Sequence, residues 1–203
     1  MPRHDRMREP VARTSTPKTS ANTDILSLKV TLRGTKPAIW RRLLIPGTMT
    51  LGHLHTAIQA AMGWHDCHLH AFDIGGRQYG DRQTLDDAAD EKRMTLNGLL
   101  KTGVTRFAYA YDFGDNWEHM VAIEKPLPAI DGETYPICSA GKRNCPPEDC
   151  GGVWGYDELL TILADPAHPE HAEQSDWVGD DFDPEECNLE RANSRLAARF
   201  RKK

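Results

Sequence analysis

Two short runs of alternating apolar residues, followed directly by a helical pattern, constrain the fold of this chain more than any other feature. In residues 25–32 and in residues 38–45, apolar side chains at every second position fall on one face, as in half-buried strands. A loop of about five residues joins them, which predicts a hairpin. Thr50 can cap a helix that begins at Leu51, and apolar residues recur at helical spacing until Gly63. We therefore expect a hairpin packed on this helix.

The patterns downstream predict more strands and a second hairpin. A strand is expected over residues 68–74, a polar surface loop over 80–92 and a short helix near 95–100. Residues 106–113 and 118–124 read as two strands joined by turn-forming Gly, Asp and Asn.

The C-terminal part has weaker patterns. Residues 129–155 contain many prolines and glycines and no period, so we expect an irregular segment. One helix is expected over about 156–164 and another from Asn188 onward. The order of elements predicts an α+β protein with a β-grasp-like mixed sheet packed on one main helix, and an irregular C-terminal extension that contains helices.

Charge and composition suggest one domain between two basic tails. Of the 203 residues, 39% are hydrophobic and 27% charged, which suits one globular core. Residues 1–23 predict a disordered basic tail, residues 24–190 a single domain, and residues 191–203 a basic C-terminal tail. Such tails are either simply solvated or contact a partner, protein or nucleic acid.

The chain has no feature that directs it into or across a membrane. No stretch approaches the roughly 18 consecutive apolar residues of a spanning helix, and the N-terminus lacks the apolar region of a secretory signal. We expect a cytoplasmic protein. Its five cysteines are then thiols or metal ligands rather than disulfides.

Histidines concentrate in one short segment. Five of the nine histidines lie within 18 residues: His53, His55, His65, His68 and His70. On a strand, His68 and His70 would point to the same face and could share one ion, with His119 facing them across the sheet. In the alternative interpretation, His55 fills the edge of the helix and the other rings bond backbone or water.

Cysteines form a second group of potential ligands. Cys138, Cys145 and Cys150 lie in the irregular segment, where three thiolates could close over a structural zinc ion with a fourth ligand. Their spacing is not the paired Cys-x2-Cys of zinc ribbons. Buried or reduced thiols without a metal are the alternative.

The second predicted turn gathers polar groups. Asp112, Asp115 and His119 lie close together in the sequence, with Trp117 among them, and they suit general acid/base chemistry or a hard cation. Alternatively, the polar residues satisfy the backbone of the turn while Trp117 covers the core.

Common catalytic signatures are missing from the sequence. No serine stands in a Gly-x-Ser-x-Gly context, no cysteine in a recognised catalytic motif, and the glycines at 151–155 lack the lysine of a P-loop. A nucleophilic hydrolase is therefore not supported.

The motifs together resemble a known family. They are Pro37-Ala38-Ile39-Trp40-Arg41-Arg42, Leu54-His55, Met62-Gly63-Trp64, His68-Leu69-His70-Ala71-Phe72, Tyr111 to His119, and Cys145-Pro146-Pro147-Glu148-Asp149-Cys150-Gly151-Gly152 followed by Trp154-Gly155-Tyr156. They resemble the plasmid pRi ORF-three-like family, also known as the TnpR-type passenger of certain insertion elements. The resemblance spans about residues 24 to 190.

The resemblance implies a compact α+β domain found in bacteria and archaea, often on plasmids or mobile elements. It supplies no biochemical activity to transfer, and the chain lacks the signature of a serine recombinase. Our leading hypothesis is a non-catalytic binding or accessory module. The alternative is a metal-dependent hydrolase or nuclease that uses His55, His68, His70 and His119.

Overall fold

The centre of the protein is an eight-stranded sheet, seen in a computed structural model that describes residues 25–201. The strand order is β5-β4-β3-β6-β7-β1-β2-β8, and only the β4–β5 pair is parallel. The strands are β1 (Ile25–Leu32), β2 (Trp40–Pro46), β3 (His70–Ile74), β4 (Arg77–Gly80), β5 (Ala89–Asp90), β6 (Arg106–Tyr111), β7 (Trp117–Leu127) and β8 (Ile137–Lys142). The tail predicted over residues 1–23 lies outside the described residues.

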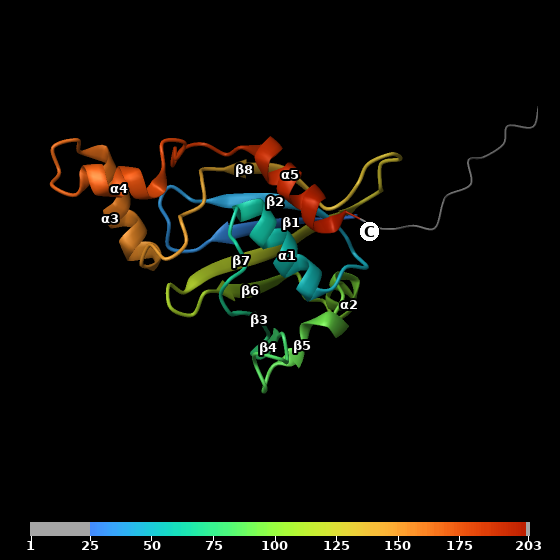
Figure 1. Ribbon diagram of the computed structural model, residues 1–203. Helices are drawn as coiled ribbons and strands as arrows, with labels where there is room; N and C mark the ends of the chain where they lie inside the picture. Colours follow the sequence, from blue (N-terminus) through green and yellow to red (C-terminus); the bar gives the residue numbers. More distant parts are fainter. Residues whose placement is uncertain (1–24, 202–203) are drawn as a thin grey trace, which may run out of the picture.

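Two helices cover one face of this sheet. Figure 1 shows α1 (Leu51–Met62) and α5 (Leu189–Phe200) lying side by side across the strands, while α3 (Gly152–Ala164) and α4 (His171–Val178) stand at one end. The short helices η1 (Glu91–Arg93) and α2 (Leu96–Lys101) lie after β5. The α+β class and the mixed sheet are confirmed, whereas the β-grasp-like arrangement is not.

The first hairpin forms as its alternation predicts. Leu28 and Val30 of β1 face the core and are at most 1% exposed. On the opposite face, Lys29 and Arg42 lie over the ring of Trp40, which is a cation–π arrangement on a solvated surface. One face of the hairpin is therefore core and the other is surface.

Helix α1 begins and ends where the sequence predicts. The Thr50 side chain accepts a hydrogen bond from the His53 backbone, and the His53 ring closes a capping box. Gly63 ends the helix in the left-handed conformation, with φ of 100°. The predicted apolar stripe is buried throughout: Leu51, Leu54, Ile58, Ala61 and Met62.

One predicted strand and one predicted irregular segment differ from the structure. Strand β3 begins at His70 instead of residue 68, so His68 lies in the preceding bend and the predicted sharing of one strand face by His68 and His70 is wrong. The segment 129–155 is not wholly irregular, because it contains β8. That strand is held by its pairing with β2, a long-range contact that no local pattern reveals.

The predicted C-terminal helix is present as α5 and belongs to the core. Ala192 and Leu196 are buried, although residues 191–203 were expected to be a tail. Arg195 donates from Nε to the Ala60 carbonyl at 2.7 Å, near the C-terminal end of α1. Part of the basic C-terminal cluster therefore stabilises a helix end. Within residues 25–201, no helix has the length and apolar character that crossing a membrane requires.

Candidate functional site

The histidine-rich segment opens onto one pocket, which we call the histidine pocket. It has a volume of about 610 Å³ and lies between the start of α1, the bend before β3, and the segment from β4 to η1. Most of its walls are imidazoles, carboxylates and hydroxyls. The lining residues are Thr50, Gly52, His53, His55, Thr56, Asp66, His68, Leu69, His70, Asp81, Thr84, Glu91 and Lys92.

His55 stands in a buried chain of hydrogen bonds. Helical spacing places His55 and Gln59 on one face of α1, and both reach the Tyr109 hydroxyl, at 2.8 and 3.1 Å. Since Gln59 donates to that hydroxyl, Tyr109 donates its own hydrogen to His55 Nδ1. The Nε2 proton of His55 then points to Asp66 Oδ1, 2.7 Å away. The chain therefore fixes the tautomer of a neutral imidazole.

Burial is the main cause of the pKa shifts in this chain of hydrogen bonds. It lowers the pKa of His55, against the hydrogen bond to Asp66, which raises it. Burial also raises the pKa of Tyr109 well above its ordinary value, so this hydroxyl keeps its proton. For Asp66, burial is the largest cause and raises the pKa, but the hydrogen bond from His55 and the electrostatic effects of His55, His70 and Arg199 together outweigh it, so the net shift is downward.

His70 lies flat against His55 and has its own carboxylate. The two ring centroids are 3.4 Å apart and the ring planes differ by 5°. His70 Nε2 lies 2.8 Å from Oε2 of Glu91, a glutamate that is 3% exposed. A buried glutamate requires such a partner. The pocket wall is thus two stacked imidazoles, each held by an acidic side chain.

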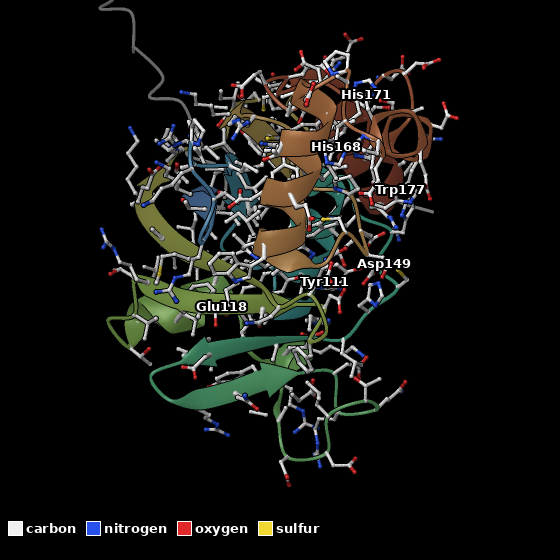
Figure 2. All side chains as sticks on the ribbon, turned by 90° about the vertical axis from the view of Figure 1, so that its left-hand side faces the viewer. Tyr111, Glu118, Asp149, His168, His171 and Trp177 are labelled. Atoms are coloured by element: carbon white, nitrogen blue, oxygen red, sulfur yellow. The ribbon has the colours of Figure 1, made fainter. Side chains whose placement is uncertain are left out.

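His68 faces a different pair of acids. Its Nε2 lies 3.3 Å from Asp149 Oδ1 and 3.8 Å from Asp112 Oδ2. This nitrogen is shielded from solvent and makes no hydrogen bond to any described residue. In Figure 2, Asp149 and Tyr111 are both labelled near the lower end of α3. The three ligand atoms all lie within 4.8 Å of one another, so they could hold a metal ion.

Glu148 fastens the bend before β3 to the segment between the cysteines. Its Oε2 accepts from the backbone and ring of His65, at 3.1 and 2.6 Å. Its Oε1 accepts from the Tyr111 hydroxyl at 2.5 Å and from the Cys67 thiol at 3.7 Å. Burial raises the pKa of Glu148, yet the hydrogen bonds from Tyr111 and His65 lower it overall. Both oxygens of this carboxylate are therefore engaged within the protein.

Four of the seven predicted binding residues do not line the pocket: Asp112, which lies beside His68, and Asp115, Trp117 and His119. His119 and Trp117 are 0% exposed and belong to the aromatic core around Trp64. Asp115 accepts from the Gly151 backbone at 3.2 Å and thereby joins the β6–β7 turn to the start of α3. His119 does not face His68 and His70 in a shared pocket.

The three predicted zinc ligands do not form a common group among the described residues. The Cys138 thiol is buried and donates to the Ala140 carbonyl. Burial raises the pKa of Cys138 to about 11, raises that of Cys150 to about 12 and raises that of Cys145 as well. Burial therefore favours the thiol form of these side chains over the thiolate at neutral pH.

Sequence patterns alone did not single out several residues of the site. Glu148 and Asp149 lie between Cys145 and Cys150 in the sequence. The sequence predicts the cysteines as metal ligands, whereas in the structure the two carboxylates lie in groups that could hold a metal ion. Tyr109 and Glu91 read as an ordinary strand residue and a loop residue. The signal that was present is the Pro-Pro-Glu-Asp sequence at residues 146–149, because such a rigid turn can present two acids to a neighbouring loop.

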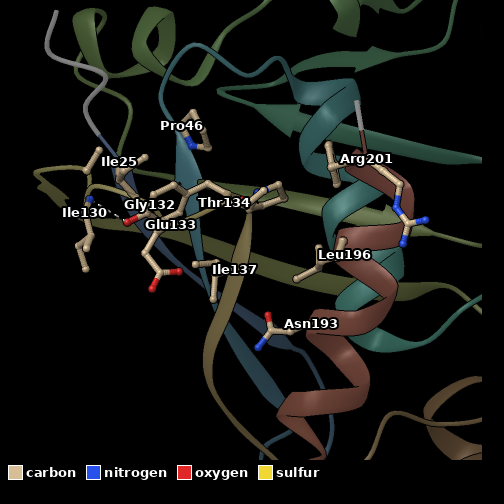
Figure 3. A pocket seen from close by; sticks show the side chains of 15 residues that line it. Ile25, Pro46, Ile130, Gly132, Glu133, Thr134, Ile137, Asn193, Leu196 and Arg201 are labelled. Atoms are coloured by element: carbon tan, nitrogen blue, oxygen red, sulfur yellow. Dashed lines mark hydrogen bonds between the residues drawn. The ribbon is translucent and has the colours of Figure 1, made fainter. Parts of the chain in front are cut away.

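A hollow larger than the histidine pocket lies elsewhere and has a different character. It has a volume of about 1020 Å³ and runs between α5 and the segment from Ala129 to Ile137. In Figure 3, Leu196 and Arg201 line one side while Ile25 and Ile130 line the other. Its lining contains neither a histidine nor a cysteine, so it offers no comparable chemistry.

Comparisons with known proteins agree with the motifs. The family model described as plasmid pRiA4b ORF-3-like protein matches residues 24–191. The chain is 41% identical over 186 residues to uncharacterized protein y4hQ of Sinorhizobium fredii (strain NBRC 101917 / NGR234), covering 88% of this chain and 95% of that protein. It is 43% identical to the crystal structure of MM3350, a protein of unknown function from Methanosarcina mazei Go1. That match has a TM-score of 0.77 and covers 82% of this chain and 96% of that one. The resemblance seen in the sequence is confirmed.

Proposed function

The chain belongs to the plasmid pRiA4b ORF-3-like family, and on that premise we propose that it is a non-catalytic binding module that takes a small polar ligand in the histidine pocket. The observation that carries the proposal is the pocket itself. Its volume of about 610 Å³ lies within the range of small-molecule sites, and polar side chains approach it from several elements.

Support for binding without catalysis comes from the hydrogen bonds of the histidines. Both ring nitrogens of His55 are engaged, with Tyr109 and Asp66, and Nε2 of His70 is engaged with Glu91. A general base must reach its substrate through a free nitrogen, and His55, at the centre of this hydrogen-bond chain, has none. These rings instead form a rigid wall whose orientation the carboxylates fix.

The same groups suggest the class of ligand. Asp66, Asp81 and Glu91 bring carboxylate oxygens to the pocket, and Lys92 brings the ammonium group. Lys92 is already paired with Asp81 at 2.9 Å. Hydrogen-bond acceptors therefore outnumber free donors, which favours a ligand rich in N–H or O–H groups, such as an amine or a polyol, over a phosphate or a carboxylate.

The alternative function, a metal-dependent hydrolase or nuclease built on His55, His68, His70 and His119, has less support. His119 is enclosed in the core, and His55 and His70 are held by their own partners. Ligands of one ion must converge within bonding distance. An acidic pocket also disfavours the phosphate backbone of a nucleic acid.

A blocked-pocket variant tests the proposal. The metal-free full chain would be screened by thermal shift against matched sets of amines, polyols and nucleotides. A ligand that binds the native state raises the melting temperature. We expect stabilisation by a member of the amine or polyol set, and its loss in Thr56→Phe, because that residue lines the pocket.

The chain supplies a matched control for this variant. Thr161 on α3 bonds the carbonyl four residues earlier, at 2.9 Å, as Thr56 does at 3.1 Å on α1. Thr161→Phe should leave the ligand response unchanged. Equal responses in both variants, or no response to any compound, would contradict the proposal.

A further inference from the structure

We propose that His68, Asp112 and Asp149 bind a divalent transition-metal ion at the edge of the histidine pocket. His68 lines that pocket, so the ion would stand beside the bound ligand. The inference goes beyond the proposed binding function and does not depend on it, because the ion can be tested by itself.

The spacing of the three side chains fits one small ion. Metal–ligand distances of about 2.0–2.2 Å and a tetrahedral angle place neighbouring ligand atoms about 3.4 Å apart. The separation between His68 Nε2 and Asp149 Oδ1 is 3.3 Å, and that between His68 Nε2 and Asp112 Oδ2 is 3.8 Å. All three ligand atoms lie within 4.8 Å of one another. The remaining side of the triangle, between the two aspartates, is at most 4.8 Å long, and a turn of the exposed Asp149 side chain would shorten it.

Burial supplies an independent argument. Asp112 is 7% exposed, and its Oδ1 is fixed by the Gly114 backbone at 2.9 Å, which leaves Oδ2 directed toward His68. The Nε2 atom of His68 is itself shielded from solvent and makes no hydrogen bond within residues 25–201. A buried imidazole nitrogen needs a partner. A cation between this nitrogen and Asp112 Oδ2 supplies that partner.

A second group of potential ligands, Cys67, His68 and Glu148, also lies within 4.8 Å. It is the weaker candidate because Glu148 already accepts hydrogen bonds at both oxygens, from His65 and Tyr111. We therefore assign Glu148 a positioning role: it holds the segment that carries Asp149 against the bend that carries His68. Asp149 is 73% exposed at its side chain and is free to turn toward an ion.

The donor set indicates which ion is preferred. One imidazole nitrogen favours zinc and its neighbours in the transition series over calcium and magnesium, which prefer oxygen alone. Zinc is therefore expected to bind ahead of manganese. Three protein ligands leave a fourth position open for water or for a group of the ligand in the pocket.

Metal binding by the full chain tests the inference directly. After dialysis against a chelator, zinc, manganese and calcium would each be titrated by calorimetry, and bound metal would be counted by elemental analysis. We expect one equivalent of zinc, with weaker manganese binding and no calcium binding at the same concentration. Asp149→Asn should lower the affinity for zinc at least about tenfold. Glu148→Gln should lower it about 10- to 100-fold, because the segment that carries Asp149 is then no longer held in place.

The variants separate a lost ligand from a lost fold. Asp149→Asn changes a mostly exposed side chain, so its melting temperature without metal should equal that of the parent. Asp131→Asn, in the exposed turn after β7, is the matched control and should keep full affinity. His68→Ala should abolish binding.

Three results would overturn the inference. The first is that the parent takes up no zinc. The second is that Asp149→Asn and His68→Ala both retain parental affinity. The third is that affinity falls in Cys67→Ser and remains in Asp149→Asn. Each is independent of the ligand screen on metal-free protein, so failure of the metal site and failure of the binding pocket are distinguishable.

Discussion

Residues 53–70 and residues 138–150 both concentrate potential metal ligands, but hydrogen bonds organise the first region and close packing organises the second. In the first, His55 and His70 stack and each meets a carboxylate. In the second, the thiols of Cys138 and Cys145 point into the core and are at most 6% exposed. The second region still serves the first, because its acids Glu148 and Asp149 reach the histidine side. Potential metal ligands that lie close together in the sequence therefore form a site only where their side chains also converge in space.

The largest expected effect is on stability and concerns His119, which is fully buried and lies outside both regions. Burial lowers its pKa to about 4 from the ordinary value near 6.5. Between these values the unfolded chain binds the proton and the folded protein does not, so stability falls as the pH falls from about 6.5 to about 4. This shift corresponds to about 3 kcal/mol.

Urea unfolding of the parent and of His119→Leu at pH 7, 5.5 and 4 would measure this effect. The variant has no imidazole to protonate, so its free energy of unfolding should decline less than that of the parent over this range. Parallel declines in the two proteins would show that His119 is not the group that takes up the proton.

A pair of tyrosine variants compares the two regions directly. The Tyr109 hydroxyl serves the histidine region and bonds both His55 and Gln59. The Tyr156 hydroxyl on α3 is equally buried but makes no hydrogen bond to a described residue. Tyr109→Phe should lower the free energy of unfolding by about 2 kcal/mol, since it leaves buried polar groups unpaired. Tyr156→Phe should be neutral or stabilising. Equal losses in denaturant unfolding would contradict the contrast.

A glycine variant tests close packing in the second region. A β-carbon added at Gly155, inside α3, would collide with the carbonyl oxygen of Cys150. Alanine normally stabilises a helix relative to glycine by about 0.5–1 kcal/mol. Here overpacking, which costs about 1–3 kcal/mol, should outweigh that gain. Gly155→Ala should therefore lower the melting temperature, and an increase would show that the segment can move aside.

The smallest effect concerns thiol reactivity, with no change in stability. Cys67 is exposed, whereas Cys138 and Cys145 are buried and burial raises their pKa values. Alkylation by iodoacetamide followed by peptide mass spectrometry should label Cys67 in the native protein and the two buried cysteines only after unfolding. Early labelling of Cys145 would mean that the second region opens readily.

Local patterns predicted much of the fold and little of the site. The first hairpin, α1 with both caps, the second hairpin and the C-terminal helix follow from alternation, helical period and turn residues. Strand β8 was missed because its stability comes from pairing with β2. His55, His68 and His70 were recognised as candidates, and the structure places all three on one pocket. Their partners Glu91 and Asp149 were missed because they are distant from the histidines in the sequence and stand in no pattern that marks a ligand.

The sequence by itself determined the α+β class, the main helix and hairpins, and the family, because those depend on periodicity and on motifs read in order along the chain. Only the tertiary structure decided which potential ligands meet. Burial kept the thiols protonated, and long-range contacts through Glu148 brought Asp149 beside His68. The physical reason is that hydrogen bonding and metal coordination act over about 2–4 Å. Spacing in sequence fixes such distances within an element, whereas packing fixes them between elements.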